Sequence, residues 1–407
     1  MSRVKIVALA LVGYALVAAP STVHAQIEAP REAAQIHLGP VSIYPSLQIV
    51  DAGRDRNVFN EETNPREDLT FTAASRAIAV AKFGQNELLF STGNDYVWFK
   101  QYAQERSNNT RYALRFNLSA SRFKPFVGVD RQHTRSRPNA EIDARARRLE
   151  RSAMAGFNIN VADRTALTAS AQISDTRFDE GERFRGVDLG NALNRSGRSA
   201  TAGVRYGLTP LTSLAVVGTY AEDRFPDSHI RDSNAYSVMP TLEFSPDASI
   251  RGKFSAGIEK FQPLDRTLPA NLGPVFEASL NWSLFGRTTF DLTGTRDTRY
   301  SYQDTEPYYL LTGGRLNIAQ RLIGPIDLLG GGDWQRLLYQ WHRGTTNDAN
   351  AANRTELVKV FSGGVGVNVG HGFRITVSGE RTERRSPQDP RKNFRRNRLL
   401  SSVTIGS

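Results

Sequence analysis

Few residues in this chain could carry out catalysis, and they do not form a familiar catalytic set. Beyond residue 25 the histidines are His37, His133, His229, His342 and His371. Two of them, His133 and His342, are the ones that could serve a hydrolase, yet no convincing nucleophile and acid accompany them. No histidine pair has metal-ligand spacing, and cysteine is absent. We predict that the chain is not an enzyme and has no catalytic residue, cofactor or metal site.

Basic residues are the more informative group. The chain has 52 lysines and arginines against 41 acidic residues, a formal net charge of +11. Its first residues show a basic start, an apolar stretch, and small residues at Val23 and Ala25, which predicts a cleaved secretory signal peptide over residues 1–25. An exported protein meets no cellular DNA, so we predict no nucleic-acid partner. Anionic sugar, lipopolysaccharide phosphate or another anionic solute would suit the charge.

The elements that must position these basic residues are strands. In residues 111–119 the apolar side chains alternate with Arg111, Arg115 and other polar residues. The same period of two recurs in 165–176 and 276–284, and this period is typical of β-strands with two different faces. After the first two dozen residues no run of eighteen apolar residues remains, which excludes a helical membrane protein.

Three further features favour a membrane barrel over a soluble sandwich. Short turns alternate with longer polar loops, most strands run to about 10–14 residues, and aromatic residues collect near strand ends. We predict an all-β fold, a single transmembrane antiparallel up-and-down β-barrel of about 18 strands (16–18) over residues 39–407, after a short periplasmic lead, 26–38. The aromatic residues expected at the membrane interfaces are Tyr96, Trp98, Tyr300, Tyr302, Tyr308, Tyr309, Tyr339 and Trp341.

Loop length also predicts the orientation of the barrel, because outer-membrane barrels have short periplasmic turns and longer external loops. We expect segments 135–145, 177–193 and 343–354 outside the cell, and turns 246–247 and 286–287 in the periplasm. Both chain ends are then periplasmic. The segment 68–81 changes its hydrophobic phase midway, which suggests a β-bulge in that strand. The predicted strands start near 41, 68, 87, 109, 122, 147, 165, 197, 212, 234, 249, 274, 288, 307, 325, 356, 372 and 395.

If the apolar phase faces lipid, the polar phase lines a lumen too wide for side chains alone to fill. The basic residues predicted on that phase, and proposed as a substrate path, are Arg111, Arg115, Arg205, Arg251, Lys253, Arg315 and Arg374. We expect fewer carboxylates on it, chiefly Glu243, Glu259, Glu277 and Glu380. A basic lumen attracts anions. The alternative is that each arginine pairs with a lumen acid and only stiffens the wall.

A second basic cluster flanks the expected external loops. Its members are Arg135, Arg137, Arg145, Arg147, Arg148, Arg151, Arg384, Arg385, Arg391, Lys392, Arg395, Arg396 and Arg398. Pairing with lipopolysaccharide phosphates at the outer leaflet is one interpretation, and a vestibule that gathers an anionic polymer is the other.

The opening strand carries a resemblance to a known family. It runs from Pro45 and Leu47 into Asp55-Arg-Asn57-Val-Phe59, and an Asp-x-Asn-[Val/Ile]-[Phe/Tyr] loop after such a strand resembles a family of outer-membrane β-barrel porins. Members often accompany exopolysaccharide export loci. The resemblance implies a barrel across nearly the whole mature chain in the cell outer membrane, and it implies no catalytic residues.

Three functions remain open from the sequence. The leading hypothesis is a pore for passive passage of an anionic solute or polymer, with exopolysaccharide export as the favoured case and periplasmic export components as partners. The second is a structural barrel that anchors surface polysaccharide or lipopolysaccharide. The third, a barrel hydrolase, has the least support. Outer-membrane lipid and lipopolysaccharide are expected partners in each case, and the sequence leaves monomer and trimer open.

Overall fold

The computed structural model describes residues 36–339, 354–370 and 372–406. The predicted signal peptide, the lead up to residue 35, His342, Trp341, His371 and most of the predicted loop 343–354 lie outside these residues. Among the residues described, no helix is long and apolar enough to span a membrane.

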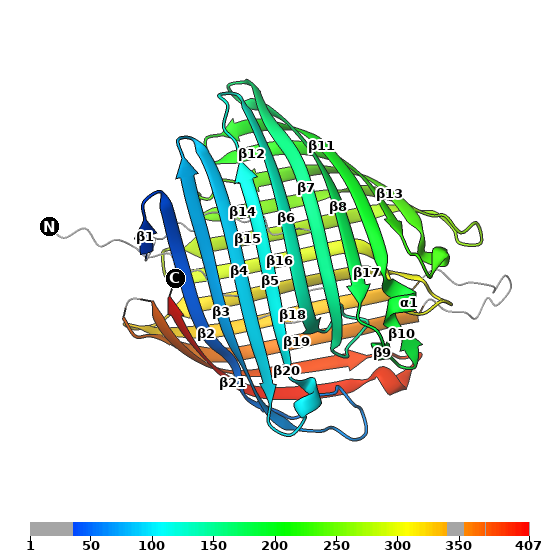
Figure 1. Ribbon diagram of the computed structural model, residues 1–407. Helices are drawn as coiled ribbons and strands as arrows, with labels where there is room; N and C mark the ends of the chain where they lie inside the picture. Colours follow the sequence, from blue (N-terminus) through cyan, green and yellow to red (C-terminus); the bar gives the residue numbers. More distant parts are fainter. Residues whose placement is uncertain (1–35, 340–353, 371, 407) are drawn as a thin grey trace.

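The fold is one closed antiparallel barrel (Figure 1). Its first seven long strands are β2 (Val41–Asp55), β3 (Asp68–Phe83), β4 (Asn86–Phe99), β5 (Ser107–Asn117), β6 (Phe123–Ser136), β7 (Ala146–Ala162) and β8 (Thr165–Phe178). Eleven more follow: β11 (Arg195–Thr209), β12 (Thr212–Arg224), β13 (Ser233–Phe244), β14 (Ile250–Pro263), β15 (Asn271–Leu284), β16 (Thr288–Tyr300), β17 (Tyr308–Arg321), β18 (Ile326–Tyr339), β19 (Arg354–Asn368), β20 (Phe373–Arg385) and β21 (Phe394–Gly406). These eighteen strands confirm the predicted fold class.

Consecutive long strands pair with each other, and the ring closes where β2 pairs with β21. A three-residue strand, β1 (Ile36–Leu38), also pairs with β2, so the last residues of the predicted lead belong to the sheet. The remaining elements are small and lie in connections: β9 (Arg183–Phe184), β10 (Val187–Asp188), α1 (Leu189–Leu193), and 3-10 turns at Ala103–Glu105, His229–Arg231 and Pro390–Lys392.

The connections differ in length between the two ends of the barrel. At the end that holds both termini they have two to five residues, and at the opposite end seven to sixteen. In Figure 1 the short strand β1 lies at the first end, and α1, β9 and β10 lie at the second. Short turns belong on the periplasmic side of such barrels, so the second end is called extracellular below.

Alternate residues of each strand face lipid and lumen. Apolar residues of one phase remain exposed, as Leu114 (41%), Val129 (53%) and Ile173 (59%) show. Such exposure is unfavourable in water but suits a surface that contacts lipid acyl chains. The opposite phase therefore lines the lumen, and it carries most of the ion pairs between neighbouring strands.

The bulge predicted within 68–81 is wrong, because β3 pairs with β4 in an unbroken register. The irregularity lies in β2, where the register to β3 shifts between Val50 and Gly53 and Asp51 has a φ of 53°. The hydrophobic phase of β3 changes for another reason. Its periplasmic half buries Val80 against its register partner Leu89 on the lumen side, so apolar residues occupy both phases there.

Cysteine labelling tests the orientation, since the native chain has no cysteine. Ile323, in the turn between β17 and β18, is 82% exposed, and Arg266, between β14 and β15, is also exposed. We expect Arg266→Cys to react with a bulky polymer-linked maleimide on intact cells. Ile323→Cys should react only after the outer membrane is permeabilised, and the opposite result would invert the orientation.

Candidate functional site

The inner wall carries all seven basic residues predicted as a substrate path. Arg111 and Arg115 lie between outward residues such as Tyr112 and Leu114, which are 45% and 41% exposed. Arg315 precedes the outward Leu316 in β17 in the same way. Their inward placement follows from the alternation of side chains along each strand.

Five of these basic residues pair with a carboxylate that lies on the next strand or on the next but one. Arg111 bonds to Asp130 at 3.0 Å, Arg205 to Glu243 at 3.5 Å, Lys253 to Glu277 at 3.2 Å, Arg315 to Asp333 at 2.6 Å and Arg374 to Asp327 at 2.8 Å. The set of lumen carboxylates predicted from the sequence is therefore incomplete. It overlooked Asp130, Asp327 and Asp333, which stand on the inner wall as direct partners.

The other two basic residues contact neutral groups. Arg251 donates to the amide oxygen of Asn281. Arg115 donates to the amide oxygen of Asn117 at 2.8 Å and lies 4.5 Å from the ring centre of Phe126. A neutral partner orients a guanidinium without cancelling its charge.

Five of the seven residues gather at the periplasmic end of the lumen. Arg251 and Lys253 are the second and fourth residues of β14, and Arg374 is the second residue of β20. Arg115 and Arg205 lie close to the periplasmic ends of β5 and β11. We call Arg115, Arg205, Arg251, Lys253 and Arg374 the periplasmic collar. It surrounds the lumen from several sides, because β5, β11, β14 and β20 are spread around the ring.

The extracellular end is organised differently, because connections fold inward across it. The segment 137–145 leaves the wall at β6 and β7 and reaches β17–β20, which lie on the far side of the ring. There Ala140 packs against Tyr309, Leu311, Leu337 and Tyr339, all buried. The inward fold of this segment thus narrows the external opening of the barrel.

Glu141 fixes this segment to the far wall. Its carboxylate accepts hydrogen bonds from the Ser301 hydroxyl at 2.7 Å, the Tyr339 hydroxyl at 2.9 Å and the Tyr302 backbone N–H at 3.2 Å. The side chain has no exposed surface. Donors from one strand connection, 301–307, and from the end of β18 converge on a single carboxylate, so Glu141 ties its own segment to two other parts of the barrel.

A second buried carboxylate, Glu356 of β19, lies beside it. Lys392 donates to Glu356 at 2.8 Å, Arg384 forms an ion pair with it, and Arg354 lies 3.7 Å away. Arg384 also binds the carbonyls of Ala140 and Glu141, each at 3.1 Å. Glu356 therefore neutralises the cations that hold segment 137–145 in place.

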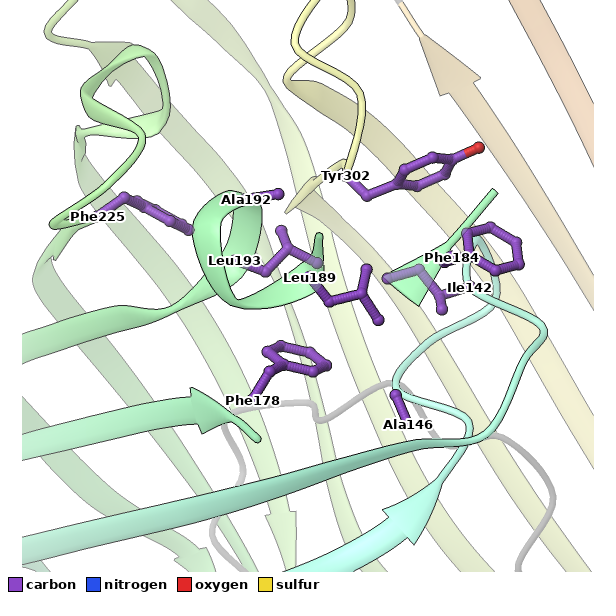
Figure 2. Packing of buried hydrophobic residues seen from close by; sticks show 9 residues of the cluster. All are labelled: Ile142, Ala146, Phe178, Phe184, Leu189, Ala192, Leu193, Phe225 and Tyr302. Atoms are coloured by element: carbon purple, nitrogen blue, oxygen red, sulfur yellow. The ribbon is translucent and has the colours of Figure 1, made fainter. Parts of the chain in front are cut away.

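An apolar cluster completes the layer (Figure 2). It joins residues from four connections, namely Ile142, Ala146, Phe178, Phe184, Leu189, Ala192, Leu193, Phe225 and Tyr302. In Figure 2 the Leu189 and Leu193 side chains of α1 lie in the middle of the cluster, between Phe178 and Tyr302. We call the inward-folded connections 137–145, 179–194, 225–232 and 301–307, packed together in this way, the loop layer.

The family assignment follows from the sequence profile. A family described as Putative beta-barrel porin 2 matches residues 29–405, nearly the whole chain and all eighteen strands. The chain belongs to this porin family. It is thus an outer-membrane β-barrel of the porin kind, and porins are channels rather than enzymes.

Comparison with solved structures finds similar chains among outer-membrane porins, at low identity. A BenF-like porin from Pseudomonas fluorescens Pf-5 shares 11% identity, covering 91% of this chain and 100% of that one, with a TM-score of 0.48. OccK2 (OpdF) from Pseudomonas aeruginosa in complex with glucuronate shares 13%, covering 89% and 98%, with a TM-score of 0.48. OpdL from the same species shares 13%, covering 91% and 99%, with a TM-score of 0.45. No curated protein matches.

In this porin the predicted second basic cluster divides into two groups. The first group is buried or nearly so and stabilises the extracellular end of the barrel; its members are Arg137, Arg145, Arg148, Arg384, Lys392, Arg396 and Arg398. Arg396, for example, pairs with the buried Asp55 of β2. The second group has exposed side chains at the surface and includes Arg147, Arg151, Arg385 and Arg395. Only this second group is placed to meet lipid or polymer.

The tyrosines predicted for the lipid interface also divide. Tyr96 is 44% exposed, as expected of an interfacial residue. Tyr302, Tyr308, Tyr309 and Tyr339 are at most 2% exposed and pack beneath the loop layer instead. Their hydroxyls explain this in part, because the Tyr339 hydroxyl binds Glu141 and that of Tyr308 binds the Ile230 carbonyl at 3.0 Å.

Burial changes the acidity of the charged groups in segment 137–145. It raises the pKa of Glu141 and of Asp143, against the opposing effects of the Ser301 hydrogen bond and of the Arg384 charge. It lowers the pKa of Arg137 to about 9. Burial therefore disfavours the charged form of each group, and the hydrogen bonds and opposite charges around it offset part of that cost.

Proposed function

We propose that this porin passes anionic solutes, and that its substrate is an acidic polysaccharide or its fragments moving outward from the periplasm. The observation that carries the proposal is the periplasmic collar. A ring of basic side chains at the entrance of a low-dielectric tube raises the local concentration of anions there.

The pairing of the collar is compatible with transport. Arg205, Lys253 and Arg374 have carboxylate partners within 3.5 Å, which hold the side chains against the wall and out of the path. Arg251 bonds to a neutral amide instead. Diffuse attraction of this kind lets a polymer enter and move on, whereas a tight site would retain it.

The loop layer favours a second candidate, a structural barrel that anchors surface carbohydrate. Its buried network crosses the external opening, and a barrel closed in this way needs to rearrange before a polymer can pass. The two candidates differ in one measurable property. A channel has an ion-selective conductance, and an anchor has none.

The test is ion selectivity in a planar bilayer. We expect the native protein to favour anions, and a variant with all five collar residues changed to glutamine to shift toward cations, because Glu243, Glu277 and Asp327 then lack their partners. The shift should shrink between about 0.1 M and 1 M salt, where the screening length falls from roughly 10 Å to 3 Å. The control carries Arg381→Gln and Arg395→Gln, exposed residues on the outward phase of β20 and β21.

Unchanged selectivity in the five-residue variant would reject the anion path. Absence of conductance in both proteins would favour the anchor. Polymer export has its own criterion: an acidic oligosaccharide should block the current more strongly from the periplasmic side than from the external side. Equal block from both sides would leave an anion channel without the outward preference.

A further inference from the structure

The outer wall carries an apolar groove that passage through the lumen does not use. It measures about 1010 Å³ and crosses β6–β8 and β11–β15. Its floor is made of small residues, Ala155, Ala169, Ala171, Ala200, Ala202 and Gly218. The same phase carries Ile173 and Val204 beside the floor, 59% and 50% exposed, so the groove opens toward lipid.

The rim of this groove is basic on its extracellular side. On the outward phase of the same strands, two to six residues nearer the extracellular loops than the groove lining, lie Arg131, Arg151, Arg177 and Arg198. Lys260 of β14 lines the groove itself. The carboxylate of Asp175 serves two of these residues, Arg151 and Arg177, each at 2.8 Å. Glu222 of β12 stands opposite Arg198 in the register and pairs with Arg224, so the rim has two carboxylates for six cations.

The position of Arg131 is the most informative. It stands directly opposite Arg151 in the β6–β7 register, and like charges in opposed positions destabilise a sheet. Among the described residues, Arg131, Arg198 and Lys260 form no ion pair with a carboxylate. An external anion between these side chains would remove the repulsion.

We propose that this surface binds the phosphorylated glycolipid of the outer leaflet, lipid A, with acyl chains in the groove and phosphates on the rim. The spacing fits such a molecule. Val127 lines the groove and Arg131 lies four residues further along β6, which is about 13 Å along an extended strand. A cationic rim and an adjoining apolar floor match a ligand with an anionic head and several acyl chains.

Native mass spectrometry of the purified barrel provides the test. We expect retained bisphosphorylated lipid A on the native protein, and an apparent affinity about tenfold weaker for the variant Arg131→Gln, Arg151→Gln and Arg198→Gln, a change of about 1.4 kcal/mol. The matched control is again Arg381→Gln with Arg395→Gln, which removes outward cations from the opposite part of the ring. It should bind lipid A like the native protein.

Filling the groove tests the acyl contacts separately. Ala169→Leu with Ala202→Leu adds side chains that point at lipid, so the barrel should keep its heat-modifiable migration on gels, while lipid A binding weakens. Equal binding of dephosphorylated lipid A or of phosphatidylglycerol would overturn the proposal, as would unchanged binding by either variant. A groove-filled protein that changes from oligomer to monomer would assign the groove to a second copy instead.

Discussion

Replacing Glu356 by alanine should destabilise the barrel by about 3–5 kcal/mol, since removing one partner of a buried ion pair leaves an uncompensated charge. Here the loss is shared by Arg384 and Lys392, whose side chains are only 1% exposed. Arg354 loses a neighbour as well. Urea unfolding of the detergent-solubilised barrel, followed by the loss of the heat-modifiable gel band, measures the change.

Glu383 is the matched control because it is an acid of the next strand with three arginines near it. Those arginines are more than half exposed, and exposed ion pairs contribute about 0–1 kcal/mol. Glu383→Ala should therefore be close to neutral. Equal loss of stability in the two variants would show that burial of the Glu356 network has no special weight.

Shortening segment 137–145 should give the largest change in conductance. Replacing residues 138–144 by two glycines removes Glu141 and Ile142, and with them the contacts to Ser301, Tyr339 and the apolar cluster. A ring of eighteen strands is too wide for its wall side chains to fill, and we expect the loop layer to be the narrowest part of the path, because it folds inward across the extracellular end. We expect single-channel conductance to rise by about a factor of two or more.

The control for this deletion leaves the loop layer intact. Shortening the 264–270 connection at its exposed residues should change conductance little, because of its residues only Leu268 belongs to a buried cluster. Unchanged conductance after the deletion in 137–145 would place the narrowest point elsewhere in the lumen. A barrel that stays closed would support the anchor rather than the channel.

Strand positions could be predicted well from the sequence. The predicted starts at 41, 68, 165, 212 and 288 coincide with the observed ones, and the others differ by three residues at most. The physical reason is that lipid and lumen impose opposite requirements on successive residues of every strand. Each strand therefore shows a period of two in its own residues, and it can be recognised from the sequence without knowing which strands lie beside it.

The loop layer could not be predicted in this way. Glu141 binds Ser301 and Tyr339, which are 160 and 198 residues away along the chain, and no local pattern encodes such a pairing. One signal was present: Ile142 is an apolar residue inside a polar, basic segment. An apolar residue in a connection favours burial, and here it joins the cluster shown in Figure 2.

The sequence predicts which basic residues face the lumen, but it does not predict their acidic partners. Alternation places Arg315 and Arg374 on the inner phase, but it does not show which neighbouring strand supplies a carboxylate. That depends on register, which aligns Arg315 opposite Asp333 in β18. For Arg374 the partner Asp327 comes from β18, two strands away, across β19.

The seam between β2 and β21 has a consequence for biogenesis. The backbone groups on one edge of β2 find hydrogen-bond partners only in β21, residues 394–406. The barrel therefore cannot close until this last of its strands has been synthesised. Near the extracellular end of that seam Asp55 pairs with Arg396, and Asn57 donates to the Arg395 carbonyl at 2.9 Å. A polypeptide that stops short of β21 would keep two open sheet edges. Their backbone N–H and C=O groups would have no hydrogen-bond partners within the lipid. Nonsense alleles late in the gene should thus behave like complete losses and load the periplasmic chaperones and proteases.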